Sequence, residues 1–363
     1  MEDRRPRSST IIHQPDEIYN IPSEERSTLL SELQGALNVD TVKAPFWSCL
    51  QVCDISKLRE LVMVARSTPA RFFSLLEDTS LSIPLVWMQR PPRDITPSTP
   101  STPSGHSARR LERPKKLAKE RDLQRCVLTG GSVFQVAHIF PHCLINPRKP
   151  SNLDASIPEF WKMLDFFFEA DRLNRWRAEM FSDPSNQNVA IDGCHNLICL
   201  NALSHDLWVR GLFALRPVSL SNDRTELVVQ FYWQPRASHG QFDAVGLLKR
   251  PISSKDLIHV ERNFISVINE GGTETTPIKS GDTFIFKTTN PDTHPLPSFQ
   301  LLDMQWHLNR IVAMCGASEI YDSDNDDDDD HCDAGAVYSP TGIESWLSSL
   351  SDTFDEDRVE EKI

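Results

Sequence analysis

The chain has 363 residues, of which 39% are hydrophobic and 25% charged, and its formal net charge at pH 7 is −13. This length is enough for one or two domains with buried cores, and the modest hydrophobic share predicts further segments that have no core. The charge is uneven, because residues 319–363 hold sixteen acidic and two basic residues and leave the other 318 residues at about +1. The net negative charge therefore does not exclude a nucleic-acid partner for the rest of the chain.

The eight cysteines include no Cys-x-x-Cys pair, and the first residues are charged and polar where a signal peptide would be apolar. No apolar run approaches the roughly 18 residues that a membrane span needs. These features exclude a secreted disulfide scaffold, a membrane protein and a Cys-x-x-Cys zinc ribbon. They predict an intracellular protein of the nucleus or cytoplasm whose cysteines are reduced.

Composition divides the chain into four parts. Residues 1–90 begin polar and continue with a moderately apolar stretch, which predicts one or two short helices. Residues 91–108 are rich in Pro, Ser and Thr and are predicted to be a linker, because they cannot bury enough apolar surface to offset their ordering entropy. Residues 109–318 are predicted to form one α+β domain. Residues 319–363 are predicted to be an acidic disordered tail, which either competes with DNA for basic residues or only solubilises the chain.

A basic block opens the predicted domain at residues 109–125. It is either the solvated face of a short helix or a segment that contacts phosphate or directs nuclear import, and the sequence leaves both open. In the second case DNA is the expected partner. The candidate nucleic-acid-binding residues are then Arg109, Arg110, Arg113, Lys115, Lys116, Lys119, Arg121 and Arg125.

After the basic block, the runs QRCVLTG and SVFQVAHIF flank Gly130 and Gly131. Two glycines supply the positive φ that a tight turn requires, so residues 124–138 are predicted to form a two-stranded hairpin that ends at His138. Next, residues 158–181 are predicted to form an amphipathic helix. Its expected core residues are Trp161, Leu164, Phe167, Phe168, Leu173 and Trp176.

The rest of the domain follows the same reasoning. A helix is expected between Asn201 as N-cap and Gly211 as C-cap, followed by a strand at LFAL. Further strands are predicted at TELVVQFYW and DTFIFKTT, and the segment LPSFQLLDMQWHLNRIVAMCG is predicted to close the domain as an amphipathic helix.

Four residues stand out together: Cys126 on the hairpin, His138 at its end, Asn196 in HNLICL and His205 on the next helix. Singly, each is more often structural. Their order, together with the segments CVLTG, AHIFP, NLICL, SHDLWVRGLFALRP and LLDMQWHLNR, resembles the HNH endonuclease family, most closely its fungal branch. The resemblance covers residues 121–315.

This resemblance implies a ββα-metal fold, in which the hairpin and the helix through His205 surround one divalent ion. It also implies a helical insertion, here residues 143–193. The first histidine of the family falls on His138, its asparagine on Asn196 and its last histidine on His205.

The implied activity is hydrolysis of DNA phosphodiester bonds with Mg²⁺, Mn²⁺ or Zn²⁺. His138 is the candidate general base, because an imidazole can take a proton from water near neutral pH. His205 is the candidate metal ligand, with His138 as a possible second ligand, because a divalent ion stabilises the charge on the leaving oxygen. Asn196 would position His138 by bonding nearby backbone.

Two positions depart from the family pattern. Ala137 stands where many HNH nucleases have an acidic metal ligand, and Val209 stands where the similar sequences often have Asp. His142, Asp192 and Asp206 are conceivable replacement ligands, each with a plain surface role as the alternative. The departures keep open a catalytically inactive HNH-derived module that binds nucleic acid or protein.

The cysteines offer two further interpretations. Cys126, Cys143, Cys194 and Cys199 could supply thiolates to zinc, but their spacing lacks paired knuckles, and buried reduced cysteines are the favoured interpretation. A cysteine nucleophile assisted by His195 is disfavoured, because no orienting third residue can be identified.

Overall fold

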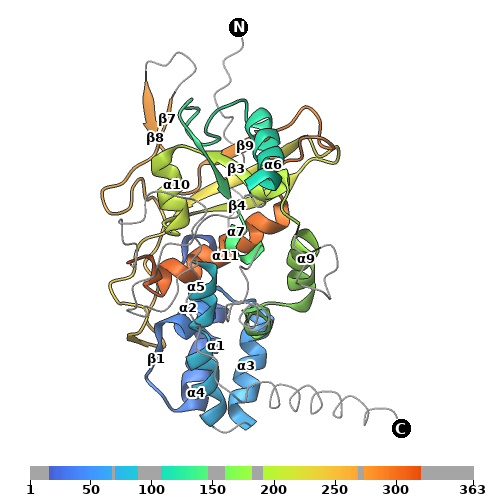
Figure 1. The fold of residues 1–363 in the computed structure, drawn as a ribbon. Helices are drawn as coiled ribbons and strands as arrows, with labels where there is room; N and C mark the ends of the chain where they lie inside the picture. Colours follow the sequence, from blue (N-terminus) through green and yellow to red (C-terminus); the bar gives the residue numbers. More distant parts are fainter. Residues whose placement is uncertain are drawn as a thin grey trace, which may run out of the picture.

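The computed structural model describes residues 16–67, 70–88, 108–145, 160–181, 191–268 and 274–319 (Figure 1). Apart from residues 108 and 319, the predicted linker over 91–108 and the predicted acidic tail over 319–363 lie outside the described residues. The described part contains both helices and strands, as expected for an α+β protein.

The N-terminal segment folds into helices that share one hydrophobic core with the rest of the chain. Its elements are η1 (Asp16–Tyr19), α1 (Glu24–Leu37), β1 (Thr41–Lys43), α2 (Ala44–Val52), α3 (Ile55–Ser67), α4 (Ala70–Thr79) and α5 (Ser82–Trp87). β1 pairs antiparallel with β6 (Ala244–Gly246), with Val42 opposite Val245. One cluster of buried apolar side chains extends from Leu29 to Ala317. The N-terminal segment is therefore not a separate unit, because its helices bury their apolar faces in the common core.

The elements that follow lead through the candidate site to the central sheet. They are α6 (Ala108–Arg121), β2 (Gln135–His138), α7 (His142–Ile145), α9 (Ala170–Met180), η2 (Cys194–Asn196), β3 (Leu197–Leu200) and α10 (Ala202–Val209). The central sheet is antiparallel with the order β4-β5-β9, where β4 is Phe213–Leu220, β5 is Glu226–Trp233 and β9 is Thr283–Lys287. A separate two-stranded ladder pairs β7 (Ser266–Ile268) with β8 (Thr275–Pro277). The strands predicted at LFAL, TELVVQFYW and DTFIFKTT are confirmed.

The predicted helix over residues 158–181 is interrupted. Residues 160–165 are helical, and α9 begins at Ala170. Asp54 binds the backbone at the break: its N–H donates to the Phe167 carbonyl (2.9 Å), and its carboxylate accepts from the Glu169 N–H (2.8 Å). These backbone groups are thus bonded outside a helix. All six predicted core residues of this segment are buried: Trp161, Leu164, Phe167, Phe168, Leu173 and Trp176.

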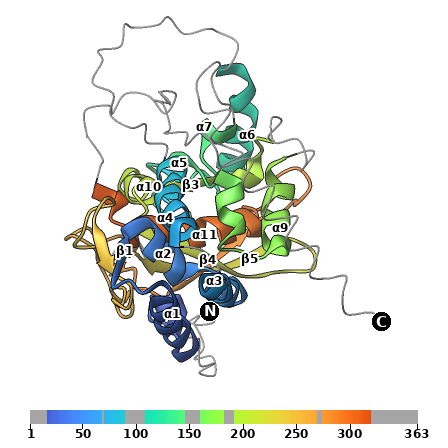
Figure 2. The ribbon, with the colours of Figure 1, turned by 90° about the horizontal axis from the view of Figure 1, so that it is seen from below.

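The helix α11 (Phe299–Met314) is the centre of the core, and η3 (Ala317–Glu319) follows it. Its N-cap Ser298 accepts hydrogen bonds from the N–H groups of Gln300 and Leu301. Thirteen of its sixteen residues are buried, so neighbours cover it on nearly every side. α11 crosses the middle of the molecule in Figure 1, and Figure 2 shows α9 and α10 on opposite sides of it. No helix in the described ranges combines the length and apolar character of a membrane span.

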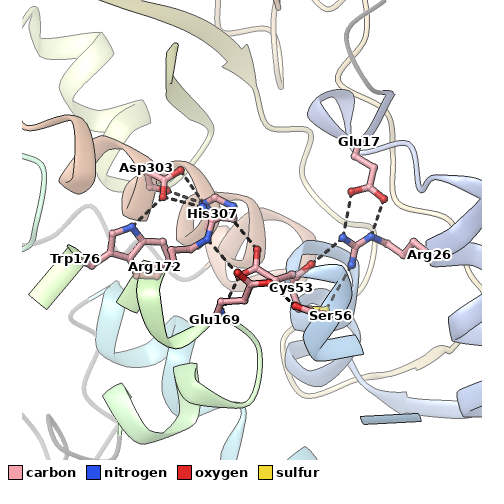
Figure 3. A network of polar contacts seen from close by, with 10 residues as sticks. Glu17, Arg26, Cys53, Ser56, Glu169, Arg172, Trp176, Asp303 and His307 are labelled. Atoms are coloured by element: carbon pink, nitrogen blue, oxygen red, sulfur yellow. Dashed lines mark hydrogen bonds and ion pairs between the residues drawn. The ribbon is translucent and has the colours of Figure 1, made fainter. Parts of the chain in front are cut away.

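A partly buried network of polar side chains links α11 to its neighbours (Figure 3). The Asp303 carboxylate accepts from Arg172 (2.8 Å) and from the Trp176 indole (3.0 Å). Arg172 also bonds Asp54 (3.1 Å), and His307 Nδ1 lies 2.7 Å from the Asp303 carbonyl oxygen. This network joins the N-terminal segment, α9 and α11.

A glycine ends α11 where no side chain fits. Gly316 has φ of +80°, and a Cβ there would lie 2.1 Å from the carbonyl oxygen of His239. We expect Gly316→Ala to lower the free energy of unfolding by about 2–3 kcal/mol, measured by urea denaturation. The matched control is Gly35→Ala within α1, where a Cβ meets nothing within 4 Å. That change should raise stability by up to about 1 kcal/mol. Equal midpoints for the two variants would show that the contact at Gly316 has no energetic role.

Candidate functional site

Two short strands and one helix form the candidate site. β2 pairs antiparallel with β3, and His138 lies opposite Leu197. η2 leads directly into β3, α10 follows β3, and α10 packs on both strands. The unit has ββα order, and the helical insertion separates its two strands.

The hairpin predicted over residues 124–138 is wrong, because the run before Gly130 closes on itself. The Cys126 N–H donates to the Gly131 carbonyl (2.9 Å), and the Gly130 N–H donates to the Cys126 carbonyl (2.9 Å). The Val127 N–H donates to the carbonyl of Cys199 in β3 (2.9 Å). The partner strand of β2 therefore comes from beyond the insertion.

His138 ends β2 and is held at both its backbone and its ring. Its carbonyl oxygen accepts a hydrogen bond from the Trp208 indole (3.0 Å). Its ring Nε2 lies 3.6 Å from Asp192 Oδ1, with the two side chains 16% and 11% exposed. The ring of His138 therefore lies beside a carboxylate. The sequence singled out Asp192 only as a metal helper and gave no sign of the role of Trp208.

Asn196 clamps the backbone that follows His138. Its side chain is fully buried; Oδ1 accepts from the Phe140 N–H (2.7 Å) and Nδ2 donates to the Phe140 carbonyl (3.1 Å). Its own carbonyl accepts from the Ile139 N–H (2.9 Å). These are the contacts expected of a positioning residue, and the catalytic role of Asn196 remains a prediction.

α10, which carries His205, begins after the predicted N-cap Asn201, and its C-cap is Arg210, one residue before the predicted Gly211. The Asn201 side chain accepts from the Ser204 N–H (2.7 Å) as the N-cap. Gly211 follows the helix with φ of +68°, a value that favours glycine.

The partner of His205 and the ring of His138 lie on opposite faces of β2. Gln135 Oε1 lies 2.6 Å from His205 Nδ1. Because side chains alternate along a strand, Ala137 shares this face with Gln135. His138 lies on the other face with Val136, which packs into a small apolar cluster beneath α6. The described residues therefore do not bring His138 and His205 together around one cation.

A divalent metal centre does not fit the described residues. Ala137 is 1% exposed and offers no donor atom on the face of His205, whose Nδ1 already meets an amide oxygen. Asp206 pairs with Arg210 (3.4 Å), and the side chain of His142 lies outside the description. Within the described ranges, no group of three or more His, Cys, Asp or Glu residues could hold an ion. We therefore assign no catalytic step to a metal.

The cysteines around the site are buried thiols in the part of the chain that the structure describes: Cys126, Cys194 and Cys199. Burial raises the pKa of Cys194 and of Cys199, which keeps both thiols protonated and disfavours zinc binding. The side chain of Cys143 is not described. His195 Nε2 lies 3.3 Å from the Glu179 carbonyl oxygen, so this ring nitrogen contacts a backbone carbonyl and not a cysteine thiol.

The basic block forms α6 as far as Arg121 and continues beyond it to Arg125, and α6 packs against β2, β3 and η2. Its side chains divide into exposed and buried ones. Those at the surface are Arg113, Lys116, Lys119 and Arg125, with Lys115 half-buried. The side chains of Arg109 and Arg110 lie outside the described part.

Arg121 is buried, so the prediction that it contacts phosphate is wrong. Its side chain is 0% exposed and forms an ion pair with Asp122 (2.7 Å). It also donates to the carbonyl oxygens of Leu197 (2.6 Å), Cys194 (2.9 Å) and Pro295 (2.9 Å). Burial acts to lower the pKa of Arg121, but the neighbouring Asp122 carboxylate raises it, so the guanidinium stays charged. Arg121 therefore holds α6 against η2 and β3.

Comparison with known protein families finds one match to this unit. The family model described as HNH endonuclease matches residues 126–216, from the closed loop before β2 into β4. No curated protein and no solved structure matches the chain. The matched range contains the ββα unit with His138, Asn196 and His205. Residues 126–216 of this chain therefore resemble the HNH endonuclease family.

Proposed function

We propose that this domain hydrolyses phosphodiester bonds of DNA, with His138 as the general base. The observation that carries the proposal is the fixed position of His138 within an HNH domain. Trp208 bonds its carbonyl, Asn196 clamps the next two residues, and Asp192 faces its ring. A histidine held in this way can take a proton from water, and Asp192 would stabilise the resulting imidazolium.

The basic helix α6 supports DNA as the substrate. Val136 packs beneath α6 and shares its face of β2 with His138, so α6 lies on the side of the proposed base. The exposed Arg113, Lys116 and Lys119 can then contact the phosphate backbone. Asn196 acts as the positioning residue of His138.

The test is plasmid nicking by the full chain in EDTA, Mg²⁺, Mn²⁺ or Zn²⁺. We expect His138→Ala to reduce the nicking rate by about 100-fold or more. The control variant His259→Ala changes an exposed histidine outside the ββα unit and should nick at the wild-type rate. Equal nicking by the wild type and His138→Ala would eliminate His138 as the base. Comparing the rate in EDTA with the rates in the three metal solutions also decides whether nicking needs a divalent ion. The described residues alone form no binding site for such an ion.

A second candidate is a non-catalytic HNH module that binds nucleic acid. Ala137 and the Gln135–His205 contact favour it, because neither gives β2 a ligand for an ion on this face. The module would bind DNA in a salt-dependent way, with weaker binding after Lys116→Ala, and would show no nicking in any of the four solutions. Nicking that His138→Ala abolishes would exclude it.

A further inference from the structure

We infer that a hydrogen bond between Gln135 and His205 fastens α10 to β2, in the place where a bridging metal ion would otherwise join a strand to a helix. The observation is the 2.6 Å separation of Gln135 Oε1 and His205 Nδ1. An amide oxygen only accepts hydrogen bonds, so Nδ1 carries the proton and donates it. Nδ1 therefore cannot bind an ion, and an ion at His205 would have to bind Nε2 without a donor from Ala137.

The chemistry of this face of β2 agrees with such a replacement. Ala137, which shares the face, brings only a buried methyl group. A divalent ion needs several oxygen or nitrogen donors to bind firmly, and β2 commits its one polar side chain on this face, Gln135, to His205. The strand thus meets the helix through a neutral amide.

The bond forms one half of a two-point attachment. The Trp208 indole donates to the His138 carbonyl (3.0 Å), and Gln135 meets His205 three residues earlier on both the strand and the helix. The two bonds add to the packing of α10 on β2 and β3. Gln135 is therefore a positioning residue for the helix.

Thermal unfolding of the full chain tests this inference. We expect the midpoint of the wild type to be the same in EDTA and in millimolar Mg²⁺, Mn²⁺ or Zn²⁺, within about 1 °C. Gln135→Ala and His205→Ala should each lower the midpoint by about 2 °C, and the double variant should lower it no further than the larger single effect. Gln135→Glu keeps an accepting oxygen and should retain the midpoint.

Leu203→Ala is the matched control, because Leu203 is exposed on the same helix and should change the midpoint by less than about 1 °C. Additive losses in the double variant would show that the two side chains do not act through each other. A lower wild-type midpoint in EDTA, restored by one of the ions, would show that a metal makes the junction. Because unfolding is the readout, the result is independent of whether the domain cuts DNA.

Discussion

Replacing Arg121 by alanine is expected to lower the free energy of unfolding by about 3–5 kcal/mol. The change removes the donor for the carbonyl oxygens of Cys194, Leu197 and Pro295. It also takes the cation away from the Asp122 carboxylate, which is 4% exposed. Buried acceptors and a buried charge that lose their partner are far more costly than a lost surface contact. Urea denaturation of the full chain measures the effect.

Arg113→Ala is the control on the same helix. Arg113 is exposed, so its loss should change stability by less than about 0.5 kcal/mol. DNA affinity at low salt should rank the positions in the opposite order. Arg113→Ala should weaken binding, while Arg121→Lys, which keeps the charge, should bind DNA like the wild type. If Arg121→Lys were as stable as the wild type but bound DNA as weakly as Arg113→Ala, the anchoring role of Arg121 would be contradicted.

Stability is expected to fall between pH 6.5 and about 4 because of His307. Burial, aided by Arg172 and opposed by Asp303, lowers the pKa of His307 from 6.5 to about 4. As the pH drops through this window, the unfolded chain binds a proton that the folded protein does not bind. Proton binding lowers the free energy of the unfolded state, so the free energy of unfolding decreases. The loss over the whole window is on the order of 3 kcal/mol.

The free energy of unfolding of wild type and His307→Gln, measured across this pH range, isolates the effect. The wild type should lose more stability on acidification than the variant, since glutamine does not titrate. His259→Gln replaces an exposed histidine and should keep the wild-type pH dependence. Parallel curves for the wild type and His307→Gln would show that the burial of His307 does not govern its protonation.

Local sequence patterns predicted the elements whose partners lie nearby or whose faces are strongly apolar. The N-cap at Asn201, the positive φ at Gly211 and the buried length of α11 all follow from short-range rules. The partner of β2 does not, because β3 lies about 60 residues further along the chain and its pairing depends on contacts across the insertion. The shared core of the N-terminal helices was missed for the same reason.

The candidate site shows the same division. Residue type and order singled out His138, Asn196 and His205 as candidates, and strand alternation places Gln135, rather than His138, on the same face as Ala137. Composition alone could not distinguish Arg121 from Arg113. Their difference arises from carbonyl groups that η2, β3 and the loop before α11 bring to Arg121.

The position of α11 at the end of the described chain has a consequence for biosynthesis. A ribosome releases the N-terminal helices and the HNH segment first, and these elements must wait for the helix on which they pack. Until residue 314 has left the exit tunnel, much of their apolar surface has no permanent neighbour, and nascent chains in this condition are prone to aggregate or to engage chaperones. A premature stop codon before residue 299 would therefore remove α11, the helix on which the other elements pack.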